Sequence, residues 1–273
     1  YGLRMRDICA SHQLSCDTYG SFGSYPDVLE LEQLFETGKY THVAMAHHET
    51  STGMLNPLED VGALAKRYGL CFMVDAMSSF GAYPMPLEEL GIDYLVASSN
   101  KCIQGMAGLS FVVFNRSQLP KLEYQSHGYY FDLYRQWDYF RQKNQLRFTP
   151  PVQVCYAFLE AIRETLEEGV LARHKRYTRN WELLYEGMKA AGFNAFLPLE
   201  HESKILFALH LGAPLPQGFD HFHDALYAKN ITVYPGVIPE IQTFRMAVIG
   251  DLYPEDMQEV LRQVNDYLRA YKA

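Results

Sequence analysis

The sequence predicts an α/β protein, with a large domain built on a mainly parallel sheet and a small C-terminal α+β domain. In the first half, short and uniformly apolar runs alternate with amphipathic helical stretches, and such runs are typical of strands buried on both faces of a sheet. After a long helical stretch the pattern changes to short strands and helices. The 273 residues are enough for two cores. We therefore expect the large domain over residues 1–170 and the small domain over 171–273.

The predicted elements follow from the apolar periodicity. In the large domain, apolar runs predict strands at 43–46, 71–74, 94–97 and 109–114. Helical periodicity predicts helices at 3–12 and 57–68, and the second opens on Pro57, which suits a first helical turn. Farther along we expect helical chain over 152–191 with a break near Gly169, strands at 205–209, 231–234 and 243–248, and helices at 220–228 and 254–271.

Composition and charge exclude several classes of function. The formal net charge of −8 leaves no basic surface for nucleic acid. No apolar run is long enough to span a membrane, and the first residues do not resemble a signal peptide. The five cysteines are scattered, without a Cys-x-x-Cys pair, which favours reduced thiols in a cytoplasmic protein over a disulfide framework. We therefore expect a small-molecule or a protein partner.

Two further features concern the start of the chain and its histidines. The sequence opens at Tyr1 without an initiator methionine and enters a helical stretch at once, so we expect an N-terminal part to be missing from it. His47 and His48 are adjacent on an extended segment, where neighbouring side chains point to opposite faces. Such a pair cannot converge on one ion, and we expect no metal site.

Two polar residues follow predicted strands, where α/β sheets gather their chemistry. Asp75 ends one apolar strand, and Lys101 comes 26 positions later, after the next strand and a Ser-Ser-Asn turn. A desolvated lysine amine can form a Schiff base, and a carboxylate can keep a pyridine nitrogen protonated, so the pair suits pyridoxal 5′-phosphate (PLP). An Asp at this place can also cap a helix or bind a metal, and Lys101 can equally be a solvated loop lysine.

Longer strings around these residues carry a family resemblance. They are residues 48–53 (HETSTG), 75–81 (DAMSSFG), 98–105 (SSNKCIQG), 132–137 (DLYRQW), 147–151 (RFTPP), 234–236 (YPG) and 244–256 (FRMAVIGDLYPED). Together they resemble the class V aminotransferases of the fold-type I PLP enzymes, over nearly the whole chain. The resemblance implies the PLP-dependent transferase fold, PLP as the cofactor and a homodimer with active sites shared between subunits.

The resemblance also implies roles for individual residues. Lys101 is expected to bond the cofactor and then to move a proton as acid and base. Asp75 is expected to pair with the pyridinium nitrogen, and Thr50 to lie near the oxygen on the cofactor ring. Asn100 is expected near the cofactor phosphate, which Thr149 reaches across the dimer interface.

Arg245 matches the arginine that receives the substrate's anionic group, a carboxylate or a phosphonate. The strings at 100–105 and 132–137 most resemble members that transfer the amino group of 2-aminoethylphosphonate to pyruvate, in phosphonate catabolism. The alternatives are an alanine–glyoxylate or serine–pyruvate aminotransferase, or a non-catalytic remnant, because the family's glycine-rich phosphate loop belongs to an upstream region. Residues 106–108 and 246–248 depart from the family pattern, and the second departure lies beside Arg245.

Other interpretations stay open for some of these residues. Arg245 lies between apolar residues and can instead form an ion pair between domains. Thr50 and Thr149 can be turn or cap residues. Cys102, next to Lys101, is interpreted as a packing residue, because the cysteine desulfurases of this class carry their nucleophile on a separate loop.

Overall fold

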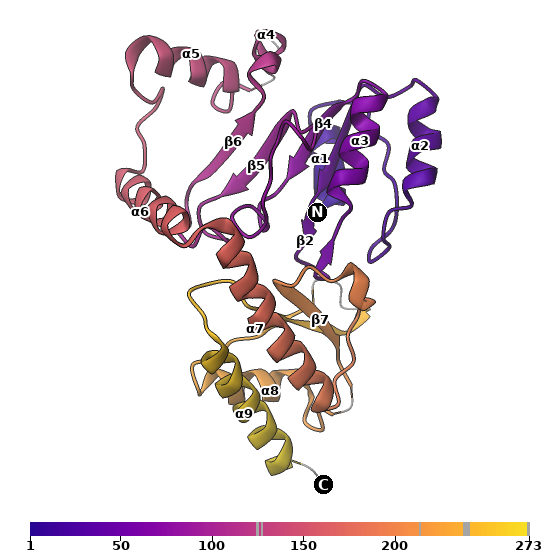
Figure 1. The fold of residues 1–273 in the computed structure, drawn as a ribbon, viewed down its shortest axis with the longest axis vertical. Coiled ribbons are helices and arrows are strands. Elements are labelled where there is room, and N and C mark those ends of the chain that lie inside the picture. The colour runs from indigo at the N-terminus through magenta and orange to yellow at the C-terminus, as the bar shows by residue number, and fades with distance from the viewer. Residues whose placement is uncertain (124–125, 127, 213, 237–240, 272–273) are drawn as a thin grey trace.

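Figure 1 shows the computed structural model, which describes residues 1–123, 126, 128–212, 214–236 and 241–271. Helices α2 (Val28–Glu36) and α3 (Leu58–Arg67) lie on the same side of the first sheet, beyond strand β4 (Cys71–Asp75). The long helix α7 (Val170–Ala190) runs from this part into the second half of the chain (Figure 1). The architecture is the predicted α/β arrangement with a smaller α+β part.

The first sheet has four strands in the order β1-β4-β5-β6. Besides β4, these strands are β1 (His42–Ala46), β5 (Tyr94–Ser98) and β6 (Ser110–Phe114). β1, β4 and β5 are parallel, and β6 pairs antiparallel with β5. The predicted strands are confirmed, each with one end differing by a single residue. Because three strands are parallel, the loops that follow them emerge at one edge of the sheet.

The first core lies between this sheet and helices α2 and α3. α3 begins after Pro57, as predicted, and α1 (Gly2–Ser11) agrees with the helix expected near the start of the chain. α2 is not among the predicted helices. Asp27 caps it by accepting hydrogen bonds from the first backbone amides of the helix. The buried residues of this core are Leu31, Phe35, Leu58, Val61, Leu64, Ala65, Leu70, Phe72, Val74, Ala76, Ile92, Leu95 and Ala97.

Several short elements connect the larger ones. β2 and β3 form an antiparallel hairpin whose turn contains Thr50. The elements of this group are β2 (His48–Glu49), β3 (Met54–Leu55), α4 (Leu119–Leu122), α5 (Leu133–Lys143) and 3₁₀ turns at Arg116–Gln118 and Leu199–His201. The hairpin matters for the site, because it follows β1 at the same sheet edge.

The predicted helical stretch is divided at the predicted place. α6 (Val152–Glu168) ends and α7 begins at Gly169, whose φ of 81° lies in the region that favours glycine. Along α7, Tyr177, Trp181 and Leu184 turn inward at helical spacing and are buried. α7 therefore supplies one wall of a second core.

The second half of the chain forms an antiparallel sheet in the order β7-β9-β8. Its elements are β7 (Leu206–His210), α8 (Gly218–Tyr227), β8 (Tyr234–Pro235), β9 (Thr243–Ala247) and α9 (Pro254–Tyr271). The prediction of a strand over 231–234 is wrong for its first three residues. The backbone amide of Ile231 donates to the carbonyl of Leu226 and so closes the end of α8, which takes this donor away from any strand ladder.

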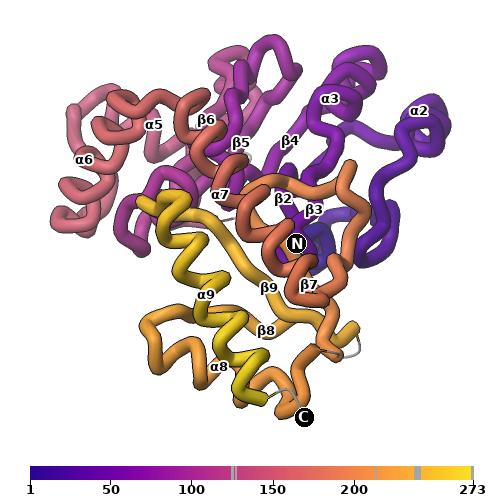
Figure 2. The backbone as a smooth tube through the Cα atoms, turned by 60° about the horizontal axis from the view of Figure 1, so that its bottom comes forward, coloured from indigo at the N-terminus to yellow at the C-terminus, as the bar shows by residue number. Residues whose placement is uncertain are grey.

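The second core gathers residues of α7, β7, α8, β9 and α9 around Phe207 and Phe244. Ala82 and Cys102, from the loops beside the first sheet, belong to the same cluster. Figure 2 shows α7 lying between the first sheet and the β7-β9-β8 part. The domain boundary after residue 170 stays a prediction, one that coincides with the break between α6 and α7. Within the described ranges, no helix is long and apolar enough to cross a bilayer.

Candidate active site

Three loops meet at the carboxyl edge of the parallel strands. Asp75 is the last residue of β4 and pairs with Ala46 of β1 on one side and Val96 of β5 on the other. Its carbonyl accepts a hydrogen bond from the backbone amide of His47, at 2.9 Å. The loop that carries Lys101 leaves β5 at the same edge. The structure therefore brings the Asp75, Lys101 and His47 segments together.

The Asp75 carboxylate is partly buried at this edge. One of its oxygens, Oδ1, accepts a hydrogen bond from the backbone amide of Met77 at 2.9 Å. Burial raises the pKa of Asp75, and the hydrogen bond from Met77 opposes that rise. Among the described residues, no cationic side chain forms an ion pair with Asp75. The site therefore has a desolvated carboxylate that a protonated ring nitrogen would stabilise.

Lys101 lies in a turn that is closed by its own backbone. The amide of Gln104 donates to the carbonyl of Lys101 at 2.8 Å, and the amide of Gly105 donates to the carbonyl of Ser99 at 2.7 Å. The Ser99 hydroxyl also donates to the carbonyl of Met106. No described residue forms a hydrogen bond or an ion pair with the partly buried Lys101 amine, so the amine is available for chemistry.

His48 is a buried neighbour of Lys101 that the sequence reasoning missed. Its Nδ1 lies 2.9 Å from the Ser78 hydroxyl, and its Nε2 lies 2.9 Å from the Ser203 hydroxyl. Burial, together with the charges of His47 and Lys101, lowers the pKa of His48 to about 3. A neutral imidazole therefore links the hairpin to two serines.

His47, beside it, bonds Ser79 instead. The Nδ1 of His47 lies 3.0 Å from the Ser79 hydroxyl, and burial lowers the pKa of His47 to about 4. Within the described ranges, no group of three or more His, Cys, Asp or Glu side chains could hold a metal ion. The two histidines thus serve the polar packing between the hairpin and the loop after β4.

Arg245 and Thr50 come together although 195 positions separate them. The Nη1 of Arg245 donates to the Thr50 carbonyl at 2.8 Å, and its Nε donates to the Pro235 carbonyl at 3.2 Å. The Thr50 hydroxyl donates to the Tyr1 hydroxyl at 2.9 Å. In the part of the chain that the structure describes, Arg245 has no carboxylate partner, so its positive charge is not neutralised.

The remaining predicted residues differ in position. Asn100 is exposed next to Lys101. Thr149 is exposed in the segment between α5 and α6, which lies beyond β6 on the side away from the β2-β3 hairpin (Figure 1). Cys102 is fully buried, its thiol donates to the Ser78 carbonyl at 3.2 Å, and burial raises its pKa to about 12. These surroundings suit a packing residue and not a thiolate nucleophile.

Glu202 is a buried acid between the hairpin and β7. Gly53 of the hairpin turn faces the Glu202 carboxylate closely, and the backbone amide of Ser203 donates to the Gly53 carbonyl. Neither carboxylate oxygen of Glu202 has a hydrogen-bond partner among the described residues. Burial raises the pKa of Glu202 to about 8, against the opposing charge of Lys204. This carboxyl group therefore holds its proton in neutral solution.

Comparison with known proteins identifies the family. The family model named aminotransferase class-V matches residues 19–233, which is most of the chain. The chain belongs to the class V aminotransferases. Members of this family are PLP-dependent, so the predicted enzyme class and cofactor are confirmed at this level.

Similar sequences cover almost all of this class V aminotransferase. A 2-aminoethylphosphonate–pyruvate transaminase of Lysinibacillus sphaericus is 37% identical over 271 residues, spanning 98% of this chain and 74% of the relative. The transaminase of the same name from Salmonella schwarzengrund is 39% identical over 272 residues, spanning 97% of this chain and 73% of the relative. The chain thus spans about three quarters of the length of these relatives.

Solved structures of aminotransferases share the fold. The ureidoglycine–glyoxylate aminotransferase of Bacillus subtilis has a TM-score of 0.88, with 23% identity, over 98% of this chain and 71% of that one. The alanine–glyoxylate aminotransferase of a Nostoc species has a TM-score of 0.87, also with 23% identity, over 97% of this chain and 72% of that one. The predicted fold class is therefore confirmed.

The site fits PLP in two respects. The desolvated Asp75 carboxylate lacks a cationic partner among the described residues, and the Lys101 amine is likewise unpaired at the same sheet edge. PLP would supply an aldehyde for the amine and a protonated ring nitrogen for the carboxylate. The roles of all the predicted site residues remain predictions: Lys101, Asp75, Thr50, Asn100, Thr149 and Arg245.

The pKa of Glu202 generates a prediction about stability. Between its ordinary pKa of 4.5 and about 8, Glu202 keeps its proton in the folded state but loses it on unfolding. The free energy of unfolding therefore falls as pH rises through that window. Glu202→Gln removes this loss, so the amount by which the Tm of the variant exceeds that of the wild type should be roughly 7 °C larger at pH 8.5 than at pH 5.

Thermal melts at both pH values measure this difference. Glu200→Gln is the matched control, because Glu200 is exposed two positions earlier on the chain. A Tm difference for Glu202→Gln that stays the same at the two pH values would contradict the prediction.

Proposed function

We propose that this aminotransferase transfers the amino group of 2-aminoethylphosphonate to pyruvate, giving phosphonoacetaldehyde and alanine. The observation that carries the proposal is the 37–39% identity, over 97–98% of the chain, to relatives named for that reaction. The position of Arg245 beside Thr50 supports it, since the reaction needs a cation for an anionic substrate. We place the enzyme in the cytoplasm on the strength of its five free thiols, and in phosphonate catabolism because the proposed reaction consumes a phosphonate.

In the proposed mechanism, Asp75 and Lys101 at the sheet edge have different roles. PLP, when bound, supplies an electron sink that stabilises negative charge at the substrate's Cα. The Asp75 carboxylate keeps the ring nitrogen protonated. The Lys101 amine would hold the cofactor and, once released, would move the proton from Cα to the cofactor's C4′ in the first half-reaction and in the opposite direction in the second. The turn around Lys101 is closed by the backbone hydrogen bonds of Gln104 and Gly105, which limits the motion of the chain that carries this amine.

Arg245 is the proposed binder of the substrate's anionic group. Two of its donors already hold backbone carbonyls of Thr50 and Pro235, which orient the guanidinium plane. Its charge has no described carboxylate partner, so the phosphonate of the donor and the carboxylate of the keto acid can alternate there. This matches a reaction in which two anionic substrates use one site in turn.

A spectral titration tests the function. PLP added to the purified protein should give a visible absorbance band, 2-aminoethylphosphonate should abolish it, and pyruvate should restore it. Phosphonoacetaldehyde and alanine, trapped and quantified, should accumulate in equal amounts. Lys101→Ala should lose the band and nearly all turnover, because it removes the amine that would bond the cofactor, whereas Lys39→Ala on the exposed surface should keep both.

The outcome also separates the alternatives. Turnover of alanine with glyoxylate, or of serine with pyruvate, without release of phosphonoacetaldehyde would favour the related aminotransferases. A wild-type protein that binds no PLP and turns over neither pair of substrates would favour a non-catalytic chain.

Arg245→Lys should weaken selection of the anionic substrate. A lysine cannot present the planar fork of donors, so the variant loses charge-assisted hydrogen bonds of about 1.5–3 kcal/mol. We expect kcat/KM for 2-aminoethylphosphonate to fall between about 10-fold and 100-fold, with the PLP absorbance band unchanged. Arg262→Lys on the surface of α9 is the control. Equal kcat/KM for wild type and Arg245→Lys would exclude the role.

We also propose that the enzyme is a homodimer. The outer face of α6 carries an exposed apolar stripe at helical spacing, formed by Val152, Tyr156, Leu159 and Leu166. Tyr156 is 71% exposed and Leu166 75%, and such patches mark association surfaces. Thr149 lies just before this helix, which supports the proposal that it reaches the cofactor phosphate of a second subunit.

A charge placed in this stripe should separate the subunits. Leu166→Asp puts a carboxylate into an apolar contact, so size-exclusion chromatography with light scattering should shift from dimer to monomer mass at micromolar concentration. Glu164→Lys, on the same helix but outside the stripe, should keep the wild-type mass. A Leu166→Asp protein of wild-type mass would exclude the stripe as the interface.

A further inference from the structure

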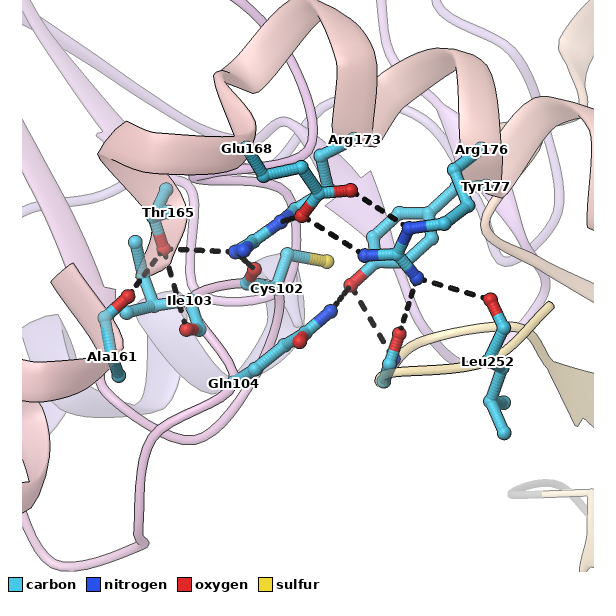
Figure 3. Close-up of polar contacts among 11 residues, drawn as sticks. Cys102, Ile103, Gln104, Ala161, Thr165, Glu168, Arg173, Arg176, Tyr177 and Leu252 are labelled. Atoms are coloured by element: carbon cyan, nitrogen blue, oxygen red, sulfur yellow. Dashed lines mark hydrogen bonds and ion pairs between the residues drawn. The ribbon is translucent and has the colours of Figure 1, made fainter. Parts of the chain in front are cut away.

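A buried arginine on α7 holds the turn that carries Lys101. The Arg173 side chain is only 2% exposed. Its Nη1 donates to the carbonyl of Cys102, the residue directly after Lys101, at 2.7 Å, and to the Thr165 hydroxyl at 2.8 Å (Figure 3). A buried cation is costly unless it is paired and hydrogen-bonded. The folded state therefore requires these contacts of the Arg173 guanidinium.

Glu168 pairs with Arg173 and extends the contact to a second arginine. Its carboxylate accepts from the Nε of Arg173 at 2.6 Å and from the Nε and Nη2 of Arg176 at 2.7 and 3.0 Å. Burial alone would raise the pKa of Glu168, but the hydrogen bonds from Arg176 and Arg173 outweigh it and lower the pKa. Glu168 is therefore the ionised centre of an arginine–glutamate–arginine network.

Arg176 connects the network to the segment after β9. Its Nη1 donates to the carbonyls of Gly250, at 2.8 Å, and Leu252, at 3.1 Å. Gly250 follows Arg245 by five positions. Figure 3 shows both guanidinium groups on the same side of α7, one reaching the Cys102 turn and the other the Leu252 segment.

Tyr177 makes a second, parallel connection between the same two segments. Its hydroxyl accepts a hydrogen bond from the side-chain amide of Gln104, at 2.5 Å, and one from the backbone amide of Gly250, at 3.3 Å. Gln104 has a φ of 66°, in the left-handed region, so the Lys101 turn has a backbone shape that needs support from outside. Tyr177 lies four positions after Arg173, which places the two side chains on one face of the helix.

We infer that Arg173, with Glu168 and Arg176, is a positioning network that fixes the Lys101 turn relative to the segment following the Arg245 strand. The network sets the distance between the amine that does the chemistry and the guanidinium that holds the substrate's anion. Arg173 itself touches neither substrate nor cofactor and acts through the Cys102 carbonyl. The inference rests on the proposed roles of Lys101 and Arg245.

The test compares Arg173→Lys and Glu168→Gln with wild type in the PLP-loaded protein. A lysine keeps the charge but cannot contact Glu168, Thr165 and the Cys102 carbonyl together. We expect kcat to fall between about 10-fold and 100-fold, because small misplacements of a reacting group cost that much, while KM for pyruvate changes less than about threefold. The pH titration of the visible absorbance band should shift by about half a unit or more in both variants.

Arg179→Gln is the matched control, since Arg179 is an exposed arginine on the same helix, and it should keep the wild-type titration and kcat. Folded Arg173→Lys and Glu168→Gln proteins with the wild-type titration and kcat, even at a lower Tm, would overturn the inference and leave the proposed function standing. A wild type without a visible band would instead contradict the proposed function. If Arg173→Lys does not fold, Glu168→Gln decides by the same two measurements.

Discussion

The site depends on one constraint, the parallel pairing of β4 with a strand on each side. Asp75, the last residue of β4, is opposite Ala46, the last residue of β1, and Val96, which lies two residues before the end of β5. Each segment then turns away at the same edge. A one-residue slip of β4 would point the Asp75 carboxylate to the other face of the sheet, since strand side chains alternate. The register of an apolar sheet thereby places a polar site.

Backbone pairing brings the loops to one edge, but it does not hold their shape. The loops are held by neutral or neutralised polar groups buried between them: His48 with Ser78 and Ser203, and Arg173 with Glu168. If one residue of either group were removed, its hydrogen-bond partner would stay buried without a partner, which is costly. Each contact therefore depends on its neighbours, and the Lys101 turn is tied to α7 through the hydrogen bond from Arg173 to the Cys102 carbonyl. This explains why α7 contributes to both the second core and the Lys101 turn.

The sequence predicted what local pattern determines. Apolar runs located the strands of the first sheet, and their ends located Asp75 and Lys101. The buried network was not predictable in this way, because residues 168–176 have the charged composition of a solvated helix and only the tertiary packing buries Arg173. Ile231 was assigned to a strand for a related reason: its β-branched side chain favours a strand, but its amide closes α8. The proposed role of Thr149 depends on a second subunit, which one sequence cannot position.

The two inward-facing arginines illustrate how surroundings decide the role of one residue type. Arg173 shares a carboxylate with Arg176 and donates to a carbonyl and a hydroxyl, so most of its charge is balanced within the protein. Arg245 donates only to carbonyl oxygens of Thr50 and Pro235, which orient a guanidinium without cancelling its charge. Burial lowers the pKa of Arg245, against the influence of Tyr1 and Tyr234, yet arginine stays protonated. An oriented and unbalanced cation recruits an anion, whereas a balanced one stabilises a turn.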